Sequence, residues 1–354
     1  MKTLYDISWQ VDEPTYRKDP ALSQSTLAKY EREGFANLST LFDHVSTPSL
    51  TFGSMVDEMI TGDMESFHKR FIVAEFPKLE PAQETAVQEM CSKYGKMYKS
   101  MDDIPDTDII STLNDCSFYQ RWGSEKRIIK IKEQACKDYY RLLRASDEKQ
   151  VVAQSDYDDA LRCAQQLRSA PGTAVYFGKD SDDVKRYYQL KFKSTIRGVE
   201  YRVMLDLCIV DYKRKVVIPC DLKTTSSMEY EFGDSFMKWR YDIQARLYWR
   251  VLRDNMDNDS FFKDFELKDF RFICINRNNN TPLVWEFPNT NYDKDINLGY
   301  KKLRAPWTIG AELKSYLDNR PAVPTGIKAV GLNSLGSYLQ KKFGLSSDEA
   351  DQAW

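Results

Sequence analysis

Alternation of apolar and polar residues predicts a meander of strands in the second half of the chain. Residues 187–196 (YYQLKFKSTI) alternate with a period of two, which is typical of a half-buried strand. Two further strands are predicted over 199–211 and 216–223. Arg197-Gly198 suits a tight turn between the first two, and Lys213-Arg214 suits the next turn. Pro219 would remove a ladder donor, which indicates an edge or a bulge at that point.

Helical periodicity and capping residues predict helices on both sides of this meander. Residues 22–34 form a short helix with Ser23 or Ser25 as N-cap and Gly34 at its end. The other expected elements are helices over 50–61, 235–254 and 333–343, a largely helical polar stretch over 81–170, and a hairpin of 271–276 with 283–287. Strands, a helix and more strands, wrapped by helices, predict an α/β class of fold.

This order of elements divides the chain into four segments. We expect N-terminal helices that contribute to the core over 1–80, a helical insertion over 81–170, the core sheet and its helix over 171–320, and a C-terminal tail with a helix over 321–354. A chain of 354 residues is long enough to bury a core of this kind.

Composition removes several classes of function. No apolar run approaches the roughly 20 residues of a membrane span, and the start MKTLYDISWQ lacks the apolar stretch of a signal peptide. Seven scattered Cys without CxxC spacing argue against zinc knuckles and suit reduced thiols in a cytoplasm. With His44 and His68 as the two histidines, the chemistry must rest mostly on carboxylates, Lys, Ser, Thr or Tyr.

Charge is distributed unevenly. The net charge is −2, but residues 185–253 hold 15 Lys or Arg and 8 Asp or Glu, a local +7. Such a segment in an otherwise acidic chain is typical either of a polyanion-binding surface or of an ordinary solvated surface, and charge alone leaves both open.

The two predicted turns bring two carboxylates together. A turn at 213–214 places Asp206 opposite Asp221, and a turn at 197–198 places Gln189 opposite Asp206. The same registers give the meander one continuous apolar face, while the other face carries the two aspartates and Lys223.

Two carboxylates on directly opposed positions repel each other, so the pair needs a compensating charge. A hard divalent cation such as Mg²⁺ is the usual partner of such a pair. Lys223, one strand step from Asp221, could hold the attacking water or stabilise charge on a phosphoryl oxygen. The alternative is a polar strand end with a surface ion pair between Asp221 and Lys223, because an isolated D-x-K is common.

The helix after the third strand adds a second polar group. Gln244 and Tyr248 are four residues apart, and Arg240 lies four residues earlier, so we expect all three on one helix face. Such a set suits contact with a phosphate backbone or a base. An ordinary solvent-exposed face is the alternative.

These motifs resemble the PD-(D/E)xK nuclease superfamily. The strand Asp221-Leu222-Lys223-Thr224-Thr225 and the helix motif Arg240-Tyr241…Gln244…Tyr248 are most similar to the exodeoxyribonuclease VIII (RecE-type) branch, with RecB-like and lambda-type exonucleases more distant. Weaker matches are Leu22 to Leu27, Phe52 to Asp57, and His68 to Glu75. The resemblance covers roughly residues 20–75 and 185–255. It implies a restriction-endonuclease-like core, a central mixed sheet flanked by helices, with an added helical segment.

The resemblance also assigns roles to residues. It implies Asp206, Asp221 and Lys223 as catalytic residues, and Gln244, Tyr248, Arg240 and Thr224 as DNA contacts. The expected metal set is Asp57, Asp206, Asp221 and Leu222, and Gln189 is a further candidate. Asp57 stands where this branch usually has a metal-binding histidine. It is either an oxygen ligand for Mg²⁺ or Mn²⁺, or a helix-surface residue.

The expected activity is Mg²⁺-dependent phosphodiester hydrolysis by an exodeoxyribonuclease that resects duplex ends for recombination or repair, with Mn²⁺ able to substitute. Closely spaced cysteines and a Walker A motif are absent, so no iron–sulfur cluster and no fused helicase are expected. Expected partners are linear duplex DNA, further copies of the chain and a single-strand annealing protein, without a membrane, in a host cytoplasm if the protein is phage-encoded. The alternatives are an inactive DNA-binding protein on the same fold and a scaffold built on residues 81–170.

Overall fold

The computed structural model describes residues 2–34, 40–42, 47–62, 64–75, 77–146, 149–288 and 290–318. His44 and the helix predicted over 333–343 lie outside these residues. No helix in the described part of the chain combines the length and apolarity needed to cross a bilayer.

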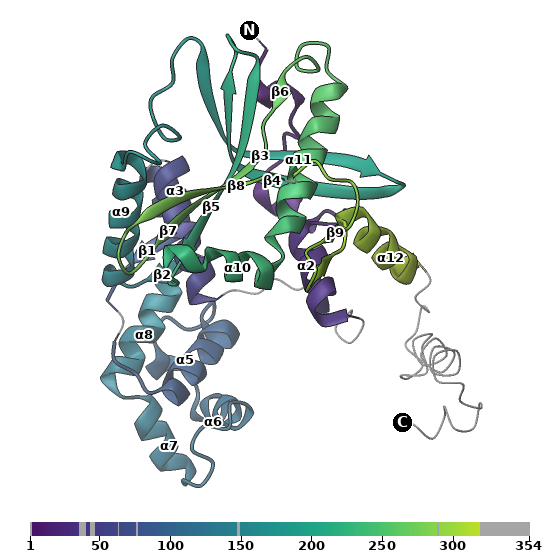
Figure 1. Ribbon diagram of the computed structural model, residues 1–354. Helices are drawn as coiled ribbons and strands as arrows, with labels where there is room; N and C mark the ends of the chain where they lie inside the picture. The colour runs from purple at the N-terminus through teal and green to yellow at the C-terminus, as the bar shows by residue number, and fades with distance from the viewer. Residues whose placement is uncertain are drawn as a thin grey trace, which may run out of the picture.

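A mixed sheet forms the centre of the molecule (Figure 1). Its strands are β3 (Val184–Ile196), β4 (Val199–Asp211), β5 (Val216–Thr225), β7 (Phe270–Asn276) and β8 (Pro282–Phe287), in the spatial order β3-β4-β5-β7-β8, and β6 (Glu266–Leu267) pairs with β5. β5 and β7 are parallel, whereas β3–β4, β4–β5 and β7–β8 are antiparallel. The predicted α/β class, with a mixed central sheet flanked by helices, is confirmed.

Both predicted registers of the meander are confirmed. Ile196 pairs with Val199 across the turn at Arg197-Gly198, where both residues have positive φ (52° and 79°), as a two-residue hairpin turn requires. Asp211 pairs with Val216, so the second connection has four residues and keeps the predicted register. Pro219 lies in a central strand rather than at an edge, between the part of β5 that pairs with β6 and the part that pairs with β7.

The predicted continuous apolar face is wrong. Leu190 and Leu205 pack in one hydrophobic core, whereas Tyr188 and Leu207, two positions along each strand, pack in the other. Gln189 lies between the two sets and has a φ of 53°, in the left-handed region. That conformation turns the strand pair, so the buried side changes beside Asp206.

Helices cover both faces of the sheet (Figure 1). On one side lie α2 (Gln24–Glu33), α11 (Tyr241–Asp257) and α12 (Pro306–Asp318); on the other lie α3 (Pro48–Thr61) and α9 (Gln154–Ser169). The predicted caps of α2 are confirmed: the Ser23 side chain accepts from the Thr26 N–H, and Gly34 ends the helix with a φ of 62°. The remaining elements are η1 (Leu4–Ile7), α1 (Glu13–Lys18), α4 (Met64–Arg70), η3 (Met101–Asp103), η4 (Glu229–Glu231), α10 (Phe232–Trp239), β9 (Ile296–Asn297) and β10 (Lys302–Leu303).

The expected helical insertion is helical but shorter than predicted. The helices α5 (Pro81–Tyr94), α6 (Asp106–Asp115), α7 (Ser124–Ile131) and α8 (Gln134–Ala145) share a core of their own and project from the rest of the molecule (Figure 1). α9, the last helix predicted to belong to the insertion, packs instead on α3 and the sheet. A short parallel pair of β1 (Phe71–Val73) and β2 (Gln150–Val152) joins the two ends of the segment.

Candidate active site

The candidate site lies where β4 and β5 separate. Their pairing ends at Leu207 with Cys220, and from Cys220 onward β5 pairs with β7. Asp206 and Asp221 are the next residues beyond that last pair. The separation leaves the two aspartates at the end of the shared ladder, where side chains from the surrounding helices can reach them.

Each of the two strand aspartates has a defined hydrogen-bond partner. The Leu222 N–H donates to Asp206 Oδ2 over 2.9 Å. Asp221 Oδ1 accepts from Gln244 Nε2, and Asp221 Oδ2 forms an ion pair with the Lys223 ammonium. Asp221 is 3% exposed, so its charge is stabilised by these two groups rather than by water.

Helix α3 brings a third carboxylate into this group. Asp57 Oδ2 accepts from Gln189 Nε2 over 2.7 Å, and its other oxygen, Oδ1, is buried with no hydrogen-bond partner. Asp57 is therefore not a solvent-exposed helix residue. Its neighbour Glu58 is turned away and forms an ion pair with Arg70 over 2.6 Å.

A glycine one turn earlier explains how α3 comes so close to β5. A β-carbon on Gly53 would lie 3.2 Å from Thr224 Oγ1, which is tighter than ordinary van der Waals contact. Residues four apart share a helix face, so the glycine that faces Thr224 directs Asp57 toward the same strand. Thr224 thus faces α3, and its part as a DNA contact stays a prediction.

Crowded carboxylates raise the affinity of the site for positive charge. Burial, followed by repulsion from Asp221, raises the pKa of Asp57 to about 7. Burial also raises the pKa of Asp206 well above its ordinary value, with Asp221 and Asp57 adding to the effect. Burial and like charges both disfavour the ionised form, and a cation held among these groups would relieve both.

Lys223 supplies the positive charge that lies directly beside these carboxylates. Burial by itself would lower the pKa of its ammonium, but Asp221, Tyr241 and Asp206 outweigh that effect and raise it. The ammonium also lies 4.9 Å from the centre of the Tyr241 ring, in a cation–π arrangement. Lys223 is consequently charged and held in one place.

Gln244 and Tyr248 share a face of α11, as predicted, and this face is turned toward the two strand aspartates: Gln244 donates to Asp221, and Asp221 and Asp206 are among the charges that raise the pKa of Tyr248. The prediction is wrong for Arg240, which does not lie on that face. The helix expected over 235–254 is divided into α10 and α11 at Arg240, whose φ of 57° is left-handed. Gln244 is 4% exposed and points to Asp221, and Tyr248 is half-buried, with its ring 5.9 Å from that of Phe270.

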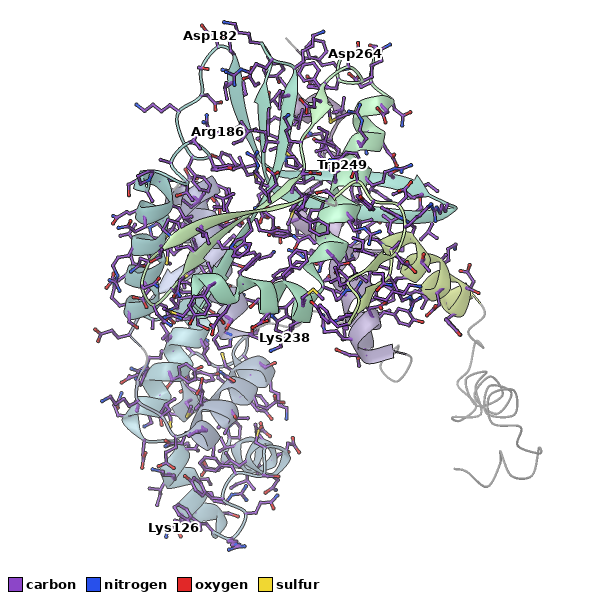
Figure 2. All side chains as sticks on the ribbon, in the orientation of Figure 1. Lys126, Asp182, Arg186, Lys238, Trp249 and Asp264 are labelled. Carbon is purple, nitrogen blue, oxygen red and sulfur yellow. The ribbon has the colours of Figure 1, made fainter. Side chains whose placement is uncertain are left out.

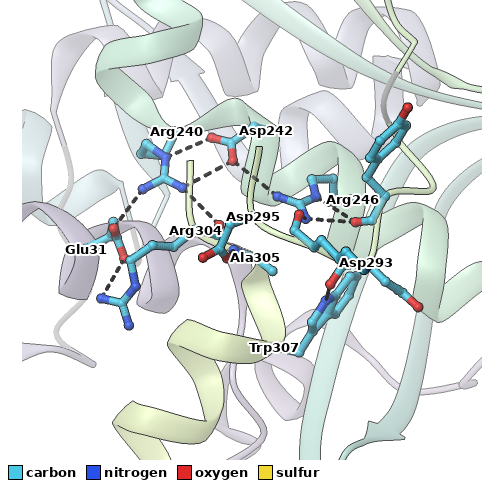
Figure 3. Close-up of polar contacts among 11 residues, drawn as sticks. Glu31, Arg240, Asp242, Arg246, Asp293, Asp295, Arg304, Ala305 and Trp307 are labelled. Atoms are coloured by element: carbon cyan, nitrogen blue, oxygen red, sulfur yellow. Dashed lines mark hydrogen bonds and ion pairs between the residues drawn. The ribbon is translucent and has the colours of Figure 1, made fainter. Parts of the chain in front are cut away.

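Arg240 is engaged inside the protein (Figure 3). It is 4% exposed, donates to Asp242 Oδ1 over 2.8 Å and forms an ion pair with Glu31 over 3.1 Å. Arg304 forms a second ion pair with Glu31, and Arg246 approaches Asp242 within 4.0 Å. This buried network joins α2, α11 and the segment before α12, so Arg240 is not available as a DNA contact.

The N-terminal helix α1 also borders the site, which the sequence analysis missed. Burial is the main cause that raises the pKa of Tyr16, and Asp206 is among the charges that raise it further. The Arg202 guanidinium lies 4.8 Å from the centre of the Tyr16 ring, and Glu13 is among the charges that raise the pKa of Asp57. Its six residues, EPTYRK, are too few to show the periodic pattern of apolar positions by which a helix can be predicted from sequence.

The donor chemistry of the site suits a hard divalent cation. Asp57 Oδ1 is a buried oxygen with neither a hydrogen-bond donor nor an ion pair, whereas Asp221 Oδ2 is held by the Lys223 ammonium. Carboxylate oxygens are the ligands that Mg²⁺ and Mn²⁺ prefer. Within the described ranges, no three His, Cys, Asp or Glu side chains are already arranged as a metal-binding group. The carboxylates instead contact Gln189, Gln244 and Lys223, which supply positive charge or hydrogen bonds.

Comparison with known proteins identifies no family for this chain. No protein-family model and no curated protein matches the chain. Among solved structures, the chain is similar to "Putative exonuclease" from Eubacterium rectale, with 10% sequence identity and a TM-score of 0.39, over 88% of this chain and 85% of that one. At this level of similarity the two proteins need not share a fold or an activity.

Proposed function

We propose that the protein is a metal-dependent deoxyribonuclease. The observation that supports it is the convergence of Asp57, Asp206 and Asp221, from α3, β4 and β5, beside the buried ammonium of Lys223. A structural ion pair would need one carboxylate, whereas this site gathers three around one ammonium and leaves Asp57 Oδ1 with neither a hydrogen-bond donor nor an ion pair. Uncompensated burial of charge is costly, and it is typical of functional sites.

The residues present have distinct parts in such a reaction. A Mg²⁺ ion would be held by Asp57, Asp206, Asp221 and the main chain of Leu222, and would supply an activated water and charge neutralisation. Gln189 and Gln244 each donate to one oxygen of a carboxylate and so fix its orientation. Lys223, held over Tyr241, is the group that would stabilise negative charge on a phosphoryl oxygen.

The finer assignment depends on the resemblance of the sequence motifs. We propose a PD-(D/E)xK exonuclease, most like the exodeoxyribonuclease VIII branch, that digests the ends of linear duplex DNA in recombination or repair. Assembly of several copies around DNA, phage origin and a single-strand annealing partner belong to the same proposal.

Digestion of two DNA forms tests this function. A 5′-phosphorylated linear duplex and a closed circle of the same sequence would be incubated with the protein in Mg²⁺, in Mn²⁺ and in EDTA. We expect loss of the linear form only, and only with metal. Asp221→Asn should abolish it, whereas Asp182→Asn, an exposed aspartate at the end of the molecule opposite the helical segment (Figure 2), should digest as the wild type does.

A second candidate is an inactive DNA-binding protein on the same fold. It is favoured by Asp57 at the position of the branch's histidine, and by the absence of a ready three-ligand group among the described side chains. Under this candidate, wild type and Asp221→Asn would leave both DNA forms intact with either metal, yet would retain linear duplex in a binding assay at low salt.

A further inference from the structure

An aromatic pocket of about 190 Å³ opens between α10 and the strands β7 and β8, of which β8 is the edge of the sheet. Phe232 and Phe272 are buried, whereas Phe236, Trp285 and Phe287 are half-buried. The pocket therefore presents ring surfaces to solvent beside the candidate active site.

The pocket is open on the side of Gly233. Apart from its chain neighbours and the backbone of its own helix, no heavy atom lies within 4 Å of the position that a β-carbon on this glycine would occupy. The one charged lining residue, Glu286, forms an ion pair with Arg271 over 3.1 Å. The pocket consequently offers apolar ring surfaces rather than an unpaired charge.

Rings connect the pocket to Lys223. The Tyr241 ring stacks on Phe272 at 5.7 Å and on Phe232 at 6.0 Å, and Lys223 lies 4.9 Å from the centre of the same Tyr241 ring. One tyrosine thus separates the lysine proposed to contact a phosphate from the wall of the pocket. A strand whose phosphate lay at Lys223 would bring a neighbouring base close to these rings.

Exposed aromatic and cationic side chains lie on the same segment. Tyr230 and Trp239, just before and at the end of α10, are 75% and 42% exposed. The Trp239 ring lies 4.9 Å from the Lys238 ammonium and 5.3 Å from the Arg32 guanidinium; Figure 2 marks Lys238 on α10. Rings that stack on bases, combined with cations that follow a backbone, are the features of a surface that binds single-stranded nucleic acid.

We infer that this pocket binds a nucleobase of a single DNA strand next to the cleaved bond. The inference rests on the proposed function, because it takes DNA as the substrate. A flat base matches stacked rings and a volume of this size, and its phosphate backbone matches Lys223 and Lys238. An unstacked base is required, so the ligand is a single strand or a frayed duplex end rather than an intact duplex.

Binding without cleavage tests this inference. Fluorescence anisotropy in EDTA would compare a labelled twelve-residue oligothymidylate with an abasic oligomer of the same length and charge. The wild type should bind the thymidylate about tenfold more tightly, because base stacking contributes about 1–3 kcal/mol per base. Gly233→Leu should fill the pocket and reduce that preference to about twofold or less, without loss of folding stability.

Two further variants keep the result interpretable. Phe236→Leu removes a flat ring while it keeps apolar volume, and it should lower the thymidylate preference. Gly123→Leu, at a glycine in the helical segment that also has open space around its β-carbon position, should leave binding unchanged.

Equal binding of both oligomers by the wild type, or an unchanged preference in Gly233→Leu, would overturn the inference and leave the pocket to a ligand of another kind. Cleavage separates this outcome from failure of the proposed function. A wild type that binds as expected but digests no DNA with Mg²⁺ would refute the nuclease and not the pocket.

Discussion

The helical segment α5–α8 and the sheet core bury different kinds of side chain. The segment buries apolar and aromatic residues together with Gln83, Thr112 and Arg127. The sheet core buries several more charged and amide groups, and it does so in two ways. Arg240, Asp242, Arg246 and Glu31 form a network of mutual ion pairs, whereas Asp57 keeps an oxygen that has neither a hydrogen-bond donor nor an ion pair.

This difference indicates which parts of the chain serve stability and which serve chemistry. Burying a charge costs several kcal/mol unless ion pairs and hydrogen bonds replace its contacts with water. The Arg240 network supplies such ion pairs and hydrogen bonds. The carboxylates of the candidate site repel one another, and Asp57 Oδ1 has neither a hydrogen-bond donor nor an ion pair. A site that lowers stability in this way is more readily explained by a ligand than by folding.

The largest expected effect is a loss of stability without a loss of activity when the core of the helical segment is changed, which would distinguish this segment from the sheet core. Phe118 is fully buried in the core of the helical segment, so Phe118→Ala should lower the free energy of unfolding by about 3–5 kcal/mol. Activity per folded molecule should remain at the wild-type level, measured by digestion of linear DNA below the unfolding transition. Ile129→Ala, at a residue of the same segment that is 66% exposed, should change stability by less than about 0.5 kcal/mol. Loss of activity in folded Phe118→Ala would show that the segment takes part in the reaction.

The next effect concerns the charge at the site. Lys223→Gln shortens the side chain by one atom, keeps it polar and removes the ammonium that pairs with Asp221. We expect digestion to fall about 100-fold, equivalent to about 2.7 kcal/mol of transition-state stabilisation. Lys213→Gln, at an exposed turn of the same sheet, is the matched control and should digest normally. A Lys223 variant within threefold of the wild type would assign this lysine a structural part only.

The third effect appears as a pH dependence of stability. The pKa of Asp57 is raised to about 7 in the folded, metal-free protein, mainly by burial and then by Asp221. An acid with a raised folded pKa contributes stability that is complete below its unfolded pKa near 4 and is lost as pH rises to about 7. Asp57→Asn should therefore match the wild type at pH 4 and exceed it by on the order of 2 kcal/mol at pH 8 in EDTA. Denaturant unfolding of both proteins at several pH values measures this, and a constant difference would contradict it.

Sequence reasoning succeeded where geometry is local and periodic. In two antiparallel strands joined by a short turn, the position of the turn determines which residues lie opposite each other. The turns near 197 and 213 therefore predicted the register that places Asp206 and Asp221 together. Composition and period also sufficed for the α/β class and for the caps of α2.

It failed where a single residue departs from the regular backbone. The left-handed conformation of Gln189 turns a strand pair, and that of Arg240 divides a helix. Neither glutamine nor arginine favours this conformation, so the sequence could not predict it. The contact of α1 with the site and the packing of α9 on the sheet are long-range, so no local pattern encodes them.

The smallest expected effect tests whether the position of α3 sets the geometry of the site. Gly53→Ala should favour the helix by about 0.5–1 kcal/mol, but its β-carbon would meet Thr224 Oγ1 at 3.2 Å. Relief of that contact by a few tenths of an ångström would displace Asp57, so we expect unchanged or slightly higher stability together with a severalfold loss of activity. Thr224→Ala removes the oxygen, and in that background Gly53→Ala should have no effect on activity, which a double-mutant cycle measures as a coupling between the two positions. Additive losses in the cycle would mean that the glycine acts through the helix itself and not through its approach to β5.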